Sequence, residues 1–403
     1  MNIDMRVYAD NAATTQMTDR SIEAVLKSMK EDYGNPSSLH TTGQLAAEKL
    51  YDARVRLANI IGAKPEEIYF TSGGSEADNQ AIRSAALLGA KKDKKHIIST
   101  KIEHHAVLHT LQRLEKEGFE VTYLDVGERG IVDVKDVEDA IREDTALVTI
   151  MYANNEIGTI QPIKEIGAVC REKKVLFHTD AVQAIGHLHV NVVKENIDLL
   201  SLSAHKFHGP KGVGALYARK GVRILPLIDG GAQEKGKRAG TENLPGIIGM
   251  VTALEEAMET LDEDNKKVSA LRDKLIEGLS QIPYSKLNGD REQRLPGTVN
   301  FIFEGIEGES LLLLLDQRGI EGSSGSACTS GSLDPSHVLM SLGLPHEVAH
   351  GSLRLSLSPF NTEEEVDYIV EQTPEVVNYL RDISPVWEEN TKNNHFFLDE
   401  RSK

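Results

Sequence analysis

Short apolar segments alternate with helical patterns through the first two-thirds of the chain, and this alternation restricts the fold more than any other feature. The apolar runs Ala146–Met151, Val175–His178 and Leu199–Leu202 are typical of strands that are covered on both faces. The amphipathic patterns Ser21–Met29 and Leu45–Ile61 predict helices. Because strands that alternate with helices tend to pair in parallel, we predict an α/β fold with a mostly parallel sheet.

The last third of the chain has a different pattern. Ile247–Ile282 is long and helical with charges on one side, which predicts a connecting helix pair. Strands and helices are mixed beyond it and predict a smaller α+β domain, with elements at Thr298–Phe303, Ser310–Arg318, Ser352–Leu357 and after Thr362. We therefore expect a large domain over residues 15–260 and a small domain formed by residues 1–14 together with 261–403.

The charge and the cysteine content argue against several classes of function. The formal net charge of the 403-residue chain is -17, whereas binding to nucleic acid or to an anionic membrane needs a basic surface. The two cysteines, Cys170 and Cys328, are too few for a disulfide framework and indicate a reducing compartment. We see neither a signal peptide nor the roughly 20 consecutive apolar residues that span a bilayer. We therefore expect a cytoplasmic protein with no nucleic-acid or membrane partner.

A lysine stands directly after one of the predicted strands. This strand leads into Ser203 and His205, Lys206 follows, and a loop rich in glycine comes next. Ligands of open α/β sheets bind in the crevice at the carboxyl ends of the strands, where a lysine amine can form the Schiff base that pyridoxal phosphate requires. Most lysines are solvated surface residues, so the prediction of a cofactor lysine depends on the surrounding motifs.

An acidic residue ends a neighbouring strand. Asp180 follows the run Val175–His178, and Gln183 lies three residues further along. The pyridine ring of the cofactor accepts electrons only while its nitrogen is protonated, so a carboxylate must lie beside that nitrogen. Asp180 suits this role and Gln183 could donate to the ring oxygen, although Asp180 could equally be a simple helix N-cap.

A glycine-rich turn follows the predicted strand Glu67–Phe70 and precedes a helix that begins at Glu76. Backbone N–H groups at a helix N-terminus bind phosphate; Gly74 would permit close approach and Ser75 would add a hydroxyl. The turn is not a Walker sequence, because no Gly-Lys-Ser/Thr follows. A plain capped helix is the alternative interpretation.

Histidines follow the predicted strand His96–Ser99. His104 could stack on the pyridine ring and move protons, or it could be an ordinary core or surface histidine. His105 and His109 have the i,i+4 spacing of a metal-binding pair, but no clear third ligand is evident. We therefore predict no dedicated metal site.

The second cysteine lies in a segment of unusual composition. Eight of the eleven residues in Gly322–Ser332 are glycine or serine, so the segment cannot bury enough apolar surface to offset the entropy cost of ordering it. A cysteine in such a mobile loop suits a nucleophile that must travel, although Cys328 could be an incidental surface thiol. Cys170 lies in a helical pattern and is predicted to be a small core residue.

Taken together, these motifs resemble those of the cysteine desulfurases of the nitrogen-fixation and iron–sulfur-cluster type, within the class V aminotransferase family. They follow the order of that family over nearly the whole chain: YADNAATT, FTSGGSEADN, EHHAV, YANNEIG, HTDAVQAIG, SLSAHKFHGPKGVG, GTEN, SSGSACTSGSLDPSHVL and AHGSLRLSL. The resemblance implies a fold-type I pyridoxal-phosphate transferase. Such an enzyme has a large domain with a mostly parallel seven-stranded sheet, a smaller α+β domain, and a homodimeric assembly.

The resemblance also implies which residues would hold the cofactor. Lys206 would carry it as a Schiff base, His104 would stack on its ring, and Asp180 would contact the ring nitrogen. Gln183 would contact the ring oxygen, and Asn155 would lie against both the cofactor and the substrate. The phosphate would be held by Gly74, Ser75, Ser203, His205 and, from the partner subunit, Thr241.

The implied substrate is L-cysteine, which would be converted to L-alanine. Asn155 and Arg354 would take its carboxylate, since a guanidinium binds both carboxylate oxygens at once. Lys206 would take the proton from Cα, and Cys328 would accept the sulfur as a persulfide and pass it to an iron–sulfur scaffold protein or another acceptor. The same Cys328 could serve as a transient iron–sulfur ligand.

Two alternatives stay open at this point. A selenocysteine lyase or another carbon–sulfur lyase would release sulfur without storing it, and Cys328 argues against that activity. A non-catalytic assembly platform would keep only the fold, and four intact residues argue against it: Lys206, Asp180, His104 and Cys328. The phosphate loop departs slightly from the family, because Gly74-Ser75 stands where Ala-Thr or Gly-Thr is common. The tail beyond Trp387 matches no familiar ending.

Overall fold

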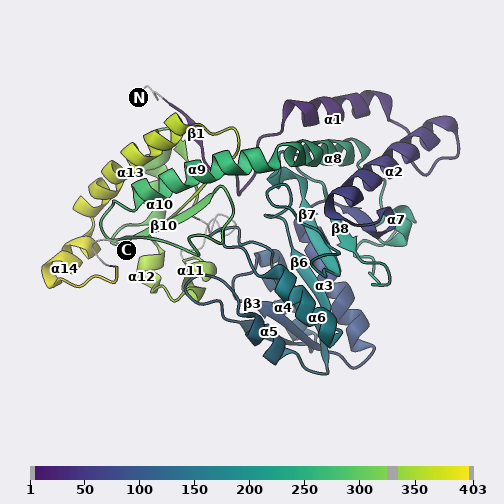
Figure 1. The fold of residues 1–403 in the computed structure, drawn as a ribbon, viewed down its shortest axis with the longest axis horizontal. Coiled ribbons are helices and arrows are strands. Elements are labelled where there is room, and N and C mark those ends of the chain that lie inside the picture. The colour runs from purple at the N-terminus through teal and green to yellow at the C-terminus, as the bar shows by residue number, and fades with distance from the viewer. Residues whose placement is uncertain (1–4, 325–334, 399–403) are drawn as a thin grey trace.

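A seven-stranded sheet lies at the centre of the larger part of the molecule. The structure, a computed structural model, describes residues 5–324 and 335–398 (Figure 1). The strand order is β2 (Ile68–Thr71), β8 (Gly214–Ala218), β7 (Leu199–Ser203), β6 (Leu176–Asp180), β5 (Thr145–Thr149), β3 (His96–Thr100) and β4 (Glu120–Leu124). β8 is antiparallel to both of its neighbours, and the other paired strands are parallel. The predicted α/β fold with a mostly parallel sheet is therefore confirmed.

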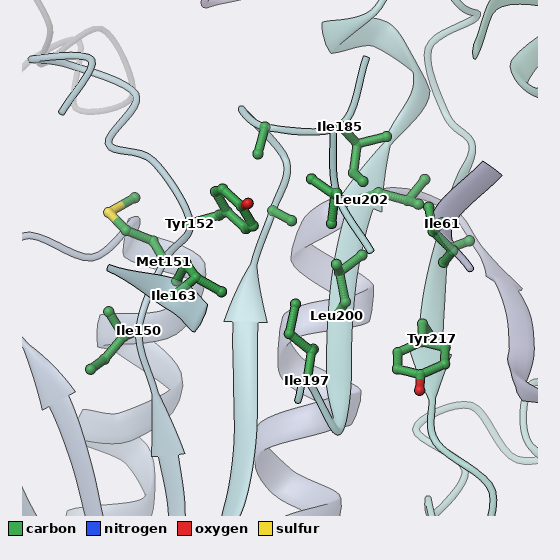
Figure 2. Packing of buried hydrophobic residues seen from close by; sticks show 14 of the residues in the cluster. Ile61, Ile150, Met151, Tyr152, Ile163, Ile185, Ile197, Leu200, Leu202 and Tyr217 are labelled. Atoms are coloured by element: carbon green, nitrogen blue, oxygen red, sulfur yellow. The ribbon is translucent and has the colours of Figure 1, made fainter. Parts of the chain in front are cut away.

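Helices cover both faces of this sheet, because alternate residues of each strand point to opposite sides. Helices α3 (Gly74–Ala90) and α4 (His105–Lys116) share one apolar cluster with Leu147 and Leu199. The next residues along the same strands, Val148 and Leu200, belong to a second cluster. This second cluster packs against α2 (Thr41–Ile61), α5 (Val134–Ala140), α6 (Ile163–Lys173) and α8 (Leu244–Glu259). Figure 2 shows part of it, with Leu200 and Leu202 on one strand beside Tyr217 of β8.

A second, antiparallel sheet forms the core of the smaller part. Its order is β12 (Ser352–Ser356), β10 (Thr298–Phe303) and β9 (Ser285–Leu287). Helices α9 (Leu261–Leu279), α10 (Gly308–Asp316) and α13 (Glu363–Asp382) share its apolar cluster. The N-terminal strand β1 (Val7–Tyr8) pairs with β11 (Ile320–Glu321), and Val7 and Ala9 join the same cluster. These contacts support our proposed division into residues 15–260 and residues 1–14 with 261–403.

The predicted helix pair is confirmed, because only Thr260 separates α8 from α9. Figure 1 shows the two helices extending across the upper half of the molecule, from the larger sheet to the smaller one. The predicted final helix is also confirmed: α13 begins after Thr362, whose hydroxyl accepts from the Glu365 N–H while the Glu365 carboxylate accepts from the Thr362 N–H.

The remaining elements are short or lie at the surface. They are α1 (Asp19–Glu31), η1 (Pro65–Glu67), η2 (Ala204–Lys206), α7 (Gln233–Gly236), α11 (His337–Ser341), α12 (His346–Ala349) and α14 (Pro385–Asn393). Strands β1, β4, β8, β9 and β11 were not predicted from the sequence. β4 lies at the edge of its sheet and begins with the exposed Glu120, so it lacks the continuous apolar run by which we identified the inner strands. No helix in residues 5–324 and 335–398 is long and apolar enough to cross a membrane.

The tail beyond Trp387 folds back onto the smaller part of the molecule. The Arg381 guanidinium lies 4.1 Å from the centre of the Trp387 ring, and the Tyr284 and Phe396 rings stack with centroids 4.1 Å apart. The Glu304 carboxylate accepts hydrogen bonds from the backbone N–H groups of Phe397 and Leu398. These contacts attach the tail to the loop after β10.

Candidate active site

A pocket of about 340 Å³ opens at the carboxyl ends of β5, β6 and β7. The structure brings ten of the predicted residues together in its wall: Gly74, Ser75, His104, Asn155, Asp180, Gln183, Ser203, His205, Lys206 and Arg354. Parallel strands end at the same edge of a sheet, so residues that are far apart in sequence meet there. The wall also includes Ala12, Ala13 and Asp78, which the sequence analysis did not assign.

Lys206 lies in the short turn η2, directly after β7. Its amine donates hydrogen bonds to the carbonyl oxygens of Ala12 at 2.7 Å and Ala13 at 2.8 Å. His187 donates from Nε2 to the Lys206 carbonyl oxygen at 2.9 Å. The amine and the backbone of Lys206 are therefore both oriented, and the N-terminal segment forms part of the site.

Asp180 ends β6 and is buried. Its Oδ1 accepts from the Val182 N–H at 3.0 Å, so it also stabilises the local turn. Burial raises the pKa of Asp180 to about 6, although the Val182 N–H and the Lys206 ammonium oppose this rise. The carboxylate is thus largely ionised at neutral pH. Gln183 donates from Nε2 to the carbonyl oxygen of Ala12 at 3.0 Å.

His104 caps the N-terminus of α4, a role that the sequence analysis did not predict. Its Nδ1 accepts from the Ala106 N–H at 3.1 Å, and this acceptor role implies that Nε2 carries the proton of the neutral ring. Burial, together with the positive charge of Lys206, lowers the pKa of His104 to about 4. The imidazole is therefore neutral at neutral pH.

The N-terminus of α3 lies in the pocket wall where we predicted the phosphate site. Gly74 begins the helix, and a Cβ atom at this position would lie only 2.5 Å from Val182 Cγ2. A side chain here would fill the space where backbone N–H groups face the pocket. His205 lies on the same side, with Nδ1 3.2 Å from the Thr14 hydroxyl. Thr241 is exposed and does not line this pocket of its own chain.

Arg354 of β12 is buried in the opposite wall. Its Nη2 pairs with Asp10 Oδ1 at 2.7 Å, and its Nη1 donates to the carbonyl oxygen of Asn155 at 3.1 Å. Its Nε is buried and has no hydrogen-bond partner among the residues that the structure describes. A buried N–H without a partner is costly, so an acceptor such as a carboxylate oxygen suits this position.

These side chains fit pyridoxal phosphate by their chemistry. The site has a helix N-terminus for a phosphate, a carboxylate for a ring nitrogen, and a lysine amine for an aldehyde. Asp10, Ala12 and Ala13 were missed as individual residues, although the motif YADNAATT had been noted. In residues 5–324 and 335–398, no group of three or more His, Cys, Asp and Glu side chains could hold a metal ion.

The structure describes one of the two cysteines, Cys170. Cys170 lies in α6 and is buried, as predicted, and burial raises the pKa of its thiol to about 12. Its thiol is therefore unreactive near neutral pH. Cys328 lies outside the described residues, as does most of Gly322–Ser332.

Comparison with known proteins identifies the family. The model of a family described as aminotransferase class-V matches residues 7–369. The chain belongs to the aminotransferase class-V family. It is a pyridoxal-phosphate-dependent enzyme with the fold-type I architecture.

Several relatives match over nearly their full length. The chain is 57% identical to "Cysteine desulfurase IscS" of Clostridium botulinum, over 97% of this chain and 99% of the relative. It is also 57% identical to the protein of the same name from Methanosarcina thermophila, over 94% of each chain. Among solved structures, a NifS-like protein superposes with a TM-score of 0.88 at 43% identity, covering 93% of this chain and 100% of that one. A structure described as "SspA in complex with cysteine" has a TM-score of 0.78 at 38% identity, covering 88% and 99%.

Proposed function

We propose that this enzyme is a cysteine desulfurase that converts L-cysteine to L-alanine and takes the sulfur on Cys328 as a persulfide. The observation that carries the proposal is the placement of Lys206 and Arg354 in one pocket, with the buried Arg354 Nε in need of an acceptor. An amine that binds pyridoxal phosphate and a guanidinium that binds a carboxylate are the two groups that an α-amino acid substrate requires. The relatives named cysteine desulfurase support cysteine as that amino acid.

The cofactor-holding roles follow from the placement of the side chains. Asp180 and Gln183 would face the pyridine ring, and the neutral His104 would lie against it. The phosphate would be held by Gly74, Ser75, Ser203 and His205 together with Thr241 of the partner subunit. When bound, the cofactor supplies an electron sink for the negative charge that develops at the substrate Cα.

The residues of the chain itself would bind and orient the substrate. Arg354 would hold the substrate carboxylate beside Asn155, which fixes the direction of the Cα–H bond. The Lys206 amine, positioned by the carbonyl oxygens of Ala12 and Ala13, would take the Cα proton. The neutral His104 could then receive or give a proton at the substrate.

Sulfur removal would require a second nucleophile, which we assign to Cys328. Its thiolate would attack the substrate sulfur, so that a sulfur–sulfur bond forms while the carbon–sulfur bond breaks. The electron pair of the broken bond would stay with the substrate carbon, which becomes the methyl group of L-alanine after protonation. The persulfide would then pass to an acceptor, such as an iron–sulfur scaffold protein, with Cys328 as a possible transient iron–sulfur ligand.

We also propose that the chain works as a homodimer in the cytoplasm. Thr241 is exposed and lies outside the pocket of its own chain, so it is available to the pocket of a second copy. Large apolar side chains are exposed on and between α1 and α2, including Met29, Tyr33 and Leu39. An exposed apolar surface of this kind suits an interface between subunits. The net charge of -17 and the two cysteines support the cytoplasmic location.

The decisive experiment compares Cys328→Ser with the matched variant Cys170→Ser. After incubation with L-cysteine, mass spectrometry should find one additional sulfur on the peptide that contains Cys328 in the wild-type enzyme. Cys328→Ser should form no persulfide and almost no alanine, because a serine hydroxyl is a far weaker nucleophile near neutral pH. Cys170→Ser should resemble the wild type, since the buried Cys170 thiol stays protonated. Full alanine production by Cys328→Ser would indicate a simple lyase instead.

A further inference from the structure

Asp78 is a buried carboxyl group in the pocket wall that has no assigned role. It lies on α3, one helical turn after Gly74, and its side chain is 2% exposed. α3 covers the face of the sheet on which His178 and Asp180 of β6 and Ser201 of β7 point toward the helix. Asp78 is thus placed behind the phosphate site and beside Asp180.

The surroundings of Asp78 provide few groups that would stabilise a negative charge. Among residues 5–324 and 335–398, its Oδ1 has no hydrogen-bond partner, and the nearest basic atom, His178 Nε2, lies 3.6 Å away, beyond hydrogen-bond distance. His178 is already engaged on both sides, with Nδ1 2.8 Å from the Thr149 hydroxyl and Nε2 3.0 Å from the Ser201 hydroxyl. Complete burial lowers the pKa of His178 to about 3. Asp78 therefore has a neutral imidazole beside it instead of a cation.

Asp180, unlike Asp78, has a nearby cation that stabilises its negative charge. Its Oδ1 accepts from the Val182 N–H, and the Lys206 ammonium attracts its charge. Two carboxyl groups that share a buried site cannot both ionise without a large cost, so the one beside the Lys206 ammonium ionises first. Burial, and then the Asp180 and Glu103 carboxyl groups, raise the pKa of Asp78 well above its usual range, although a hydrogen bond with the Ser201 hydroxyl acts in the opposite direction.

We propose that Asp78 is a positioning residue that stays protonated, so that Asp180 carries the only negative charge of this carboxyl pair. A second anion beside Asp180 would make its ionisation more costly and would raise its affinity for a proton. A neutral Asp78 instead leaves Asp180 anionic and available to the ring nitrogen of the cofactor. Asp78 would therefore act through Asp180, without touching the substrate.

Infrared spectroscopy of the cofactor-free protein tests the protonation state directly. The protein would carry aspartate with carbon-13 in its side-chain carboxyl group, which separates the bands of aspartic acids from those of glutamic acids such as Glu103. At about pH 8, above the pKa of about 6 of Asp180, we expect the carbonyl band of one protonated aspartic acid. The band should persist in Asp180→Asn and disappear in Asp78→Asn. The absence of a labelled acid band in the wild-type protein would overturn the proposal even if Asp78→Asn did not fold.

Titration with pyridoxal phosphate provides a second, independent measurement. An asparagine has nearly the shape of a protonated aspartic acid and the same charge, so Asp78→Asn should bind the cofactor within about threefold of the wild-type affinity. A loss of tenfold or more, about 1.4 kcal/mol, would mean that Asp78 contributes a negative charge and would contradict the proposal. The inference rests on the cofactor site of the proposed function, not on sulfur transfer. Neither measurement uses L-cysteine, so a failure of the desulfurase assignment would leave both results interpretable.

Discussion

Arg354 and Asp10 form an ion pair, with Nη2 and Oδ1 2.7 Å apart, that joins β12 to the N-terminal segment at the wall of the pocket. The Arg354 side chain is 3% exposed and its Nε is without a partner in the described residues. The ion pair holds one edge of the guanidinium, and the unpartnered Nε is available to a ligand. A guanidinium that is held at one edge and open to a ligand at Nε suits a residue that must be rigid before the substrate arrives.

Substitution of Arg354 should therefore raise the KM for L-cysteine. A hydrogen bond to a charged group contributes about 1.5–3 kcal/mol, so Arg354→Ala should raise the KM for L-cysteine about tenfold to a hundredfold. Asp10→Asn retains an oxygen acceptor for Nη2 and should raise KM less. Steady-state kinetics of the two variants would check this order, and an unchanged KM in Arg354→Ala would place the carboxylate site elsewhere.

Removal of the Lys206 amine should abolish both covalent cofactor attachment and turnover. In the wild-type enzyme, borohydride reduction should fix the cofactor to the peptide that contains Lys206, which peptide mapping would detect. Lys206→Ala should show no such adduct and no alanine formation. The exposed Lys220 provides the control, because Lys220→Ala should leave the reducible adduct and alanine formation unchanged. A reducible lysine adduct in Lys206→Ala would refute the assignment.

The charge of Asp180 can be separated from its structural role. Asp180→Asn keeps an oxygen that can accept the Val182 N–H, so the local turn should persist, whereas Asp180→Ala removes both the charge and the acceptor. We expect Asp180→Asn to retain most of its bound cofactor, because the phosphate contacts remain, but to lose turnover by at least about a hundredfold. Near-normal turnover in Asp180→Asn would leave the residue with only its role in the turn.

The buried Glu103 should make stability depend on pH. Burial raises the pKa of Glu103 from 4.5 to about 8, although the Thr100 hydroxyl and the Met151 N–H oppose the rise. Because the folded state binds this proton more tightly than the unfolded state, the stabilisation is complete below about pH 4.5. It is lost progressively as the pH rises to about 8.

Glu103→Gln mimics the protonated side chain and should remove this pH dependence. Relative to the wild type, the variant should gain free energy of unfolding between about pH 4.5 and 8, with no further gain above that range. Denaturant unfolding of the cofactor-free proteins at several pH values would measure the difference. The exposed Glu143 supplies the control variant Glu143→Gln. A pH-independent difference between Glu103→Gln and the wild type would contradict the raised pKa.

Much of the site could be predicted because its residues lie at strand ends and in short motifs. Lys206 and Asp180 each follow an apolar run, and Gly74 lies in a turn between a strand and a helix. The parallel arrangement of the strands then requires that these positions meet at one edge of the sheet. Strand β4 was not predicted, because an edge strand is partly exposed and its residues do not form a continuous apolar run.

The sequence by itself determined the fold class and the order of the motifs, and it predicted Lys206 as the cofactor lysine, because these depend on local patterns of polarity and turn chemistry. Only the tertiary structure decided that the carbonyl oxygens of Ala12 and Ala13 orient Lys206, from 194 and 193 positions away. It likewise decided that Asp10 pairs with Arg354 across 344 positions, and that Asp78 lies beside Asp180 with no donor for its Oδ1 in the part of the chain that the structure describes. A backbone carbonyl leaves no signature in the sequence, and the ionisation of a carboxyl group depends on burial and on neighbours that only the packed chain brings together.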